Sequence, residues 1–63
     1  MEGENKMKIR DGWHYIVVEN GVVWVDGVKK RPGVLVDTIV ARVGQNWRGM
    51  ILWEDNAITI GVA

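Results

Sequence analysis

The stretch "VENGVVWVDGVKK", residues 18 to 30, decides the fold of this chain, because it holds two turn signals around a short apolar segment. The pairs Asn20-Gly21 and Asp26-Gly27 both favour the type I′ turn, in which both central residues take positive φ and whose twist matches the strands it joins. The residues between and beside these pairs are mostly Val, Ile and Trp, which favour strands. The stretch therefore predicts two consecutive antiparallel hairpins that share one central strand.

The two turns also predict which side chains share a face of these hairpins. A two-residue loop at Asn20-Gly21 pairs Val17 with Trp24, and a second loop at Asp26-Gly27 pairs Trp24 with Lys29. Because side chains alternate along a strand, one face is aliphatic and ends at His14; its residues are Ile16, Val18, Val23, Val25 and Val28. The opposite face is aromatic with a basic border, and its residues are Trp13, Tyr15, Val17, Trp24, Lys29 and Arg31.

A hairpin that is apolar on both sides needs a second cover, since a typical antiparallel sheet leaves one face to water. Three covers would serve: the rest of a barrel, another subunit or a ligand. The sequence of the hairpin leaves this choice open.

The rest of the chain predicts more strands. Further turn signals occur at Pro32-Gly33, at 44–46 and at Asp55-Asn56, and the segments between them are rich in β-branched residues. We therefore expect an all-β fold: an antiparallel meander of five to seven short strands, closed into a small barrel of SH3-like or OB-like size, because closure removes apolar edges. Residues 1–6 are expected to form a flexible N-terminal arm, and 7–63 a single small β-barrel domain.

The segment "VLVDTIVARV", residues 34 to 43, has two interpretations. Leu35, Ile39 and Val43 recur at helical spacing. Its density of β-branched residues and its entry from Pro32-Gly33 favour a strand instead, and the barrel prediction takes it as one.

Two parts of the chain have similar sequence patterns. "WHYIVVENGVV" (13–23) and "WRGMILWEDNAI" (47–58) both run from Trp through an apolar strand to Glu, a turn pair and a second apolar strand. The second copy places its residues on two faces: Ile51 and Trp53 with Ile58 and Ile60 on one, and Met50 and Leu52 with Ala57 and Thr59 on the other. Two hairpins built by the same rules would look alike by chance; the alternative is a duplication that gives a pseudo-symmetric barrel.

Composition bounds the function classes. The chain has 63 residues, 48% of them hydrophobic, with four Trp, no Cys and a net charge of zero. A chain this short has a small core, and its apolar excess is easier to place if subunits share it, which predicts a homo-oligomer. Charge balance argues against a duplex-DNA binder. The absence of a bilayer-length apolar run and of a hydrophobic signal region predicts a cytoplasmic location without membrane contact.

No catalytic chemistry stands out. His14 is the one strong candidate for a general base, but the chain has no Ser or Cys nucleophile, and Thr38 and Thr59 look structural. The acidic residues Glu19, Asp26, Glu54 and Asp55 sit at predicted turns. We expect no enzyme activity, no catalytic residue, no cofactor and no metal, with His14 as a packing residue; a metal shared by His14 from several subunits is the alternative.

Two functions remain. The first is a binding or assembly module that self-associates, or holds a protein partner, through Trp13, Tyr15, Val17 and Trp24; a viral or mobile-element accessory protein would suit such a chain. The alternative is a single-stranded nucleic-acid binder, in which Lys29, Lys30 and Arg31 contact phosphates beside stacking Trp24 and Tyr15. A carbohydrate site at "NWRGMILWEDN" (46–56), by ring stacking, is a weaker third interpretation.

Overall fold

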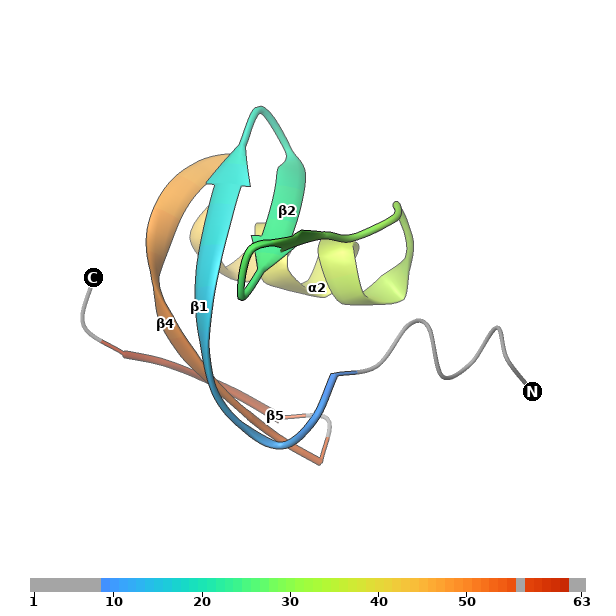
Figure 1. The fold of residues 1–63 in the computed structure, drawn as a ribbon. Coiled ribbons are helices and arrows are strands. Elements are labelled where there is room, and N and C mark those ends of the chain that lie inside the picture. The colour runs from blue at the N-terminus through green and yellow to red at the C-terminus, as the bar shows by residue number, and fades with distance from the viewer. Residues whose placement is uncertain (1–8, 56, 62–63) are drawn as a thin grey trace.

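The computed structural model describes residues 9–55 and 57–61, which form one antiparallel sheet and one helix (Figure 1). The elements in chain order are β1 (Gly12–Glu19), β2 (Val22–Val25), β3 (Val28–Lys29), α2 (Val34–Val43), β4 (Asn46–Glu54) and β5 (Ala57–Ile60). The sheet has five strands in the order β3-β2-β1-β4-β5. The predicted arm, 1–6, lies outside the described residues.

The hairpins follow the sequence prediction. Asn20 and Gly21 have φ of 50° and 80°, and Asp26 and Gly27 have φ of 51° and 84°, as type I′ turns require. The register of the first hairpin pairs Val17 with Trp24. The register of the second pairs Trp24 with Lys29. The predicted pairing is therefore confirmed, and so is the division of the strand residues between two faces. Arg31, predicted on the aromatic face, lies beyond the end of β3 instead.

The interpretation of residues 34–43 as a strand is wrong, because the segment forms α2. As a helix it places Leu35, Val36 and Ile39 together in the core. As a strand it would have put Asp37 on the same face as Leu35 and Ile39. Burial of the helical stripe outweighs the modest helix propensity of its Val, Ile and Thr residues.

The ends of α2 fit their positions. Asp37 lies in the first turn and Arg42 in the last, where each charge complements the helix dipole. Gly44 ends the helix with φ of 92°, a conformation that favours glycine, and its amide donates to the carbonyl of Val40 at 2.8 Å. The loop at 44–46 therefore stops a helix, where the sequence predicted a turn between strands.

The predicted barrel is also wrong: in the described part of the chain the sheet stays open, with β3 and β5 as its edges. The segment that would have supplied a closing strand is α2, which covers one face of the sheet instead (Figure 1). The chain is not a simple meander either, because α2 carries it from β3 across to β4, which pairs with β1. At the β5 edge, Arg42 Nη1 donates to the carbonyl of Ile58 at 3.4 Å.

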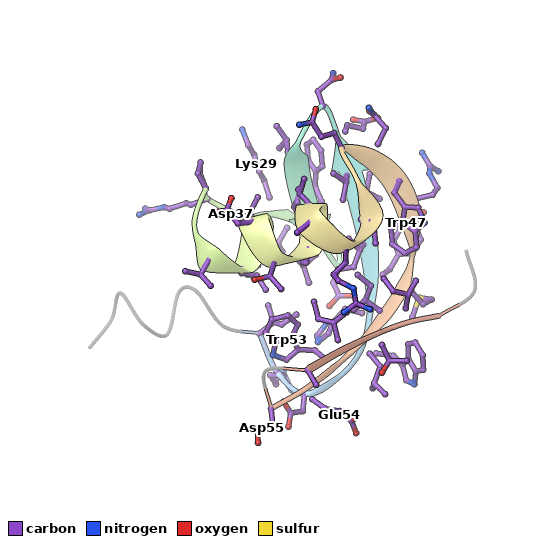
Figure 2. The ribbon with its side chains drawn as sticks, turned by 180° about the vertical axis from the view of Figure 1, so that it is seen from behind. Lys29, Asp37, Trp47, Trp53, Glu54 and Asp55 are labelled. Carbon is purple, nitrogen blue, oxygen red and sulfur yellow. The ribbon has the colours of Figure 1, made fainter. Side chains whose placement is uncertain are left out.

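The core lies between the sheet and α2. Figure 2 looks onto this side and shows Trp47 and Trp53 beside and below the helix, where they extend the cover over the sheet. The buried residues are Ile16, Val18, Val23, Val25, Leu35, Val36, Ile39, Ile51 and Trp53. The predicted aliphatic face of the first hairpin is thus the core face, except that Val28 is 57% exposed at the β3 edge.

The two similar hairpins meet at the centre of the sheet. β1 and β4 pair antiparallel over eight residue pairs, so the β1–β2 and β4–β5 hairpins are related by an approximate two-fold axis normal to the sheet. When their turns are aligned, Glu19 corresponds to Glu54 and Tyr15 to Met50. Tyr15 also pairs directly with Met50, so the axis passes through this pair.

Replacing Ile39 with Ala tests the packing of α2. Ile39 is completely buried, and its truncation is expected to cost about 2–5 kcal/mol of unfolding free energy. Thermal and urea unfolding followed by circular dichroism measure the loss. Val34→Ala is the matched control, because Val34 lies on the same helix and is 68% exposed; its effect should stay within about 0.5 kcal/mol. Equal effects of the two substitutions would contradict the packing described here.

Candidate functional site

The sheet face turned away from α2 is apolar, and among residues 9–55 and 57–61 no other element covers it. We call it the open face and define it by the outward residues of three strands: Trp13, Tyr15, Val17, Val22, Trp24, Met50 and Leu52. Trp13 is 52% and Tyr15 42% exposed, and the other five residues are half-buried. Exposed aromatic rings gathered on one face of a small domain mark a candidate binding surface.

The sequence placed part of this face correctly. The predicted residues Trp13, Tyr15, Val17 and Trp24 lie together, with Val17 directly opposite Trp24. Their role as a binding surface stays a prediction. Among the described residues, the predicted cover from the rest of a barrel is absent.

Sequence reasoning missed the other half of the face. Met50 lies opposite Tyr15, and Leu52 opposite Trp13, because β4 pairs with β1. The alternation of the second hairpin did group Met50 with Leu52. However, no local turn joins β1 to β4, so turn chemistry does not predict that the two hairpins share one surface. The similar sequence patterns of the two hairpins were the one available signal.

Trp13 reaches across β4 to the end of β5. The amide of Gly61 donates to the carbonyl of Met50 at 2.7 Å, which continues the β4–β5 ladder. A Cβ built on Gly61 would lie 2.7 Å from Cζ3 and 3.1 Å from Cη2 of Trp13. The benzo edge of the indole therefore rests on the bare backbone of Gly61, while half of the side chain stays exposed.

The predicted basic run does not act as one group. Lys29 lies on the open face opposite Trp24. The amide of Lys30 donates to the carbonyl of Val23, and Lys30 follows Lys29 with the opposite alternation. Arg31 is exposed in the loop that follows. The three predicted phosphate contacts therefore do not form a row beside the aromatic rings.

Charges of both signs border the open face. Arg48, which the sequence analysis did not single out, lies opposite Val17 and is exposed. Glu19 and Glu54 lie at the far ends of β1 and β4 and are also exposed. With Lys29 these residues give two cations and two anions around an apolar centre.

His14 lies on the core face, at the end of the sheet, and both its ring nitrogens are engaged. Nδ1 donates to Asp26 Oδ2 at 2.6 Å, and Nε2 donates to the carbonyl of Arg10 at 2.7 Å. Its side chain is 13% exposed, whereas that of Asp26 is 52% exposed. A histidine with both nitrogens occupied offers a substrate no free site for proton transfer, so this His–Asp pair has the geometry of a structural contact.

The pKa values of His14 and Asp26 are shifted in opposite directions, and both shifts favour the charged form of the residue. Burial lowers the pKa of His14, but the hydrogen bonds to Asp26 and to the Arg10 carbonyl, with the charge of Asp26, outweigh burial and raise it from its ordinary 6.5. The hydrogen bond from His14, followed by that from the Tyr15 amide, lowers the pKa of Asp26 from its ordinary 3.8.

The remaining polar residues serve the backbone of turns. Asp11 Oδ1 accepts from the Asp55 amide at 3.2 Å, and Asn46 Oδ1 accepts from the Asn20 amide at 3.1 Å. Within 9–55 and 57–61, no three His, Cys, Asp or Glu side chains come together as metal ligands would. The open face is therefore the feature that best fits a function.

Comparison with known proteins adds no relative to this picture. No protein-family model, curated protein or solved structure matches the chain. Over the described residues, the helical part of the chain is too short or too polar to cross a membrane.

Replacing Gly61 with Ala tests the contact between the Trp13 indole and the backbone of Gly61. The added methyl group cannot fit under the indole, so the ring should swing away from β5, and the shift of its Nε1–H resonance should move toward that of an exposed Trp. The measurement is a ¹H–¹⁵N spectrum with the Trp13 indole assigned. As a control, Gly61→Ala is made in a Trp13→Leu background. There it should leave the free energy of unfolding nearly unchanged, because no indole remains for the added methyl group to meet. An unmoved Trp13 resonance would contradict this contact.

Proposed function

We propose that this protein is a non-enzymatic binding and assembly module that self-associates through the open face. The observation that carries the proposal is the uncovered apolar surface across β1, β2 and β4, on the side of the sheet that α2 does not reach. A second copy of the chain would supply the missing cover.

The open face has a suitable size. β1, β2 and β4 have 8, 4 and 9 residues, 21 in all, and at a rise of about 3.4 Å per residue and a strand spacing of about 4.8 Å they cover ~340 Å² in projection. A standard protein interface removes about 800 Å² of accessible surface from each partner. Side chains roughen a flat projection and increase its accessible area, so the open face with its charged rim has the scale of a small interface of this kind.

The composition of the face also favours a protein partner. Trp, Tyr and Met occupy its centre and Arg its border, and these residue types are enriched where proteins bind one another. The charged residues lie at the periphery, where they can remain hydrated. An apolar centre with a polar rim is the usual anatomy of such an interface.

The balanced rim favours a second copy over a partner of one charge. Two cations, Lys29 and Arg48, and two anions, Glu19 and Glu54, make the border neutral. In a symmetric dimer each copy presents positive and negative side chains to the other. Opposite charges can then pair in some relative orientation of the two sheets. A strongly acidic or basic partner would leave half of the rim facing like charge.

Single-stranded nucleic acid is the second candidate, and the position of Lys29 beside Trp24 favours it. Here Trp24 and Tyr15 would stack bases, while Lys29 and Arg48 contact phosphates. Glu19 and Glu54 on the same face weigh against this candidate, because they repel the phosphate backbone.

The mass of the protein in solution tests self-association. Light scattering at micromolar concentration should give at least twice the 7.1 kDa of one chain. Trp24→Glu should reduce this mass to that of a monomer, because it places a carboxylate in the apolar contact, while circular dichroism shows a folded chain. Val34→Glu, an exposed apolar residue on α2, is the matched control and should leave the mass unchanged. A wild-type monomer would refute the proposal.

Tryptophan fluorescence separates the two candidates. The wild-type protein is titrated with a mixed single-stranded oligonucleotide at low and at high salt. Under self-association the oligonucleotide leaves the fluorescence unchanged at both. Quenching that is strong at low salt and lost at high salt, together with a monomeric mass, would establish the nucleic-acid candidate instead.

A further inference from the structure

Four polar contacts, which we call the clasp, join the β2–β3 turn to β1 and β1 to the segment before it. His14 donates from Nδ1 to Asp26 Oδ2 and from Nε2 to the Arg10 carbonyl, at 2.6 and 2.7 Å. The second carboxylate oxygen of Asp26, Oδ1, accepts from the Tyr15 amide at 3.0 Å. The amide of Asp26 in turn donates to the Tyr15 carbonyl at 2.8 Å. The Asp26 carboxylate thus joins the turn to β1, and His14 joins β1 to the segment before it.

The geometry of the clasp specifies its protonation. A carbonyl oxygen accepts hydrogen bonds and never donates, so His14 Nε2 carries a hydrogen. Nδ1 lies against a carboxylate and needs a second one. The imidazolium form has both, whereas either neutral tautomer has one. The clasp is therefore complete when His14 is charged and Asp26 is ionised.

Within the part of the chain that the structure describes, few charges surround the pair of His14 and Asp26. Asp26 and Arg10 are the charges that act on His14, and Lys30 adds its positive charge beside Asp26. On the neighbouring strand β4, the residue opposite His14 is the apolar Ile51.

The charged side chains of α2 have other positions. The Arg42 guanidinium donates to the carbonyl of Ile58 on β5, and Asp37 is exposed in the first turn of the helix. Among the described residues, the ionisation of the clasp thus depends on the burial of His14 and on the groups within and beside the clasp itself.

The two pKa shifts define where the clasp contributes stability. The pKa of His14 is raised, so its contribution is full below 6.5 and is lost as pH rises through the raised value. The pKa of Asp26 is lowered, so its contribution is full above 3.8 and is lost as pH falls through the lowered value. The clasp is complete between these limits.

We infer that the clasp makes self-association through the open face depend on pH. When His14 loses a proton, the β2–β3 turn loosens and self-association weakens. This inference rests on the proposed self-association. It adds the regulation of that surface by a pair of residues on the other side of the sheet.

The connection between clasp and surface runs through the turn. Asp26 directly follows β2, and two residues beyond the turn Lys29 lies opposite Trp24 on the open face. β3 has two residues, so its own ladder holds the turn weakly. When His14 loses a proton, its contact with Asp26 loses the positive charge, and one of its two ring contacts loses the hydrogen that makes it. The turn that follows Trp24 is then held less tightly to β1.

Two variants keep the turn but change the clasp. Asp26→Asn retains a residue that readily adopts the positive φ of this position and removes the charge. His14→Gln removes the titrating group. The association constant is measured by sedimentation for the wild type and both variants, from mildly acidic to mildly alkaline pH. In parallel, the His14 ring and the Tyr15 amide are followed by NMR.

The wild type should associate several-fold more weakly once His14 is neutral, and the Tyr15 amide should shift over the same pH range. Asp26→Asn should move this loss to lower pH, since the His14 proton has lost its anionic partner. His14→Gln should show no loss in the alkaline range.

The outcomes separate the inference from the proposed function. If the Tyr15 amide and the His14 ring titrate together while the association constant stays constant, the inference is wrong and self-association stands. If the protein is monomeric at every pH, the proposed function fails, and control of the open face by the clasp fails with it. A His14 ring that titrates at its ordinary pKa in the wild type would overturn the clasp itself.

Discussion

The pairing of β1 with β4 is the constraint on which the rest of the structure depends. Each of the two hairpins can form from its own turn, but neither has enough surface to form a core alone. Their antiparallel ladder, from Gly12 opposite Trp53 to Glu19 opposite Asn46, makes one sheet of them. This ladder aligns Ile16 and Ile51 on the side that α2 covers, and Tyr15 with Met50 on the side that stays open.

Local chemistry explains what the sequence predicted well. Asn20-Gly21 and Asp26-Gly27 specify turn type, turn type specifies register, and register specifies the face of every side chain in the hairpin. The strands at residues 12–29 and the faces of β4 and β5 could therefore be derived without any knowledge of the rest of the molecule. Trp13, Tyr15 and Trp24 were identified as one surface for the same reason.

Long-range relations explain what the sequence did not predict. The helix at 34–43 is rich in Val, Ile and Thr, whose intrinsic preference is for strands; burial of Leu35 and Ile39 against the sheet overrides that preference. The barrel followed from counting this segment as a strand. Met50 was placed on the correct face of its own hairpin, but its contact with the first hairpin depends on a pairing that no turn encodes.

The approximate two-fold axis through Tyr15 and Met50 has a consequence for how any partner would be oriented. Rotation by 180° about the sheet normal brings Val17 onto the position of Leu52. The middle of the surface is therefore apolar and similar in shape before and after the rotation. The off-axis positions break this likeness, because the rotation brings Trp24 onto Thr59 and Trp13 onto Arg48. Two indoles that meet polar side chains after the rotation thus make the two directions along the surface different, and this difference would set the orientation of a partner.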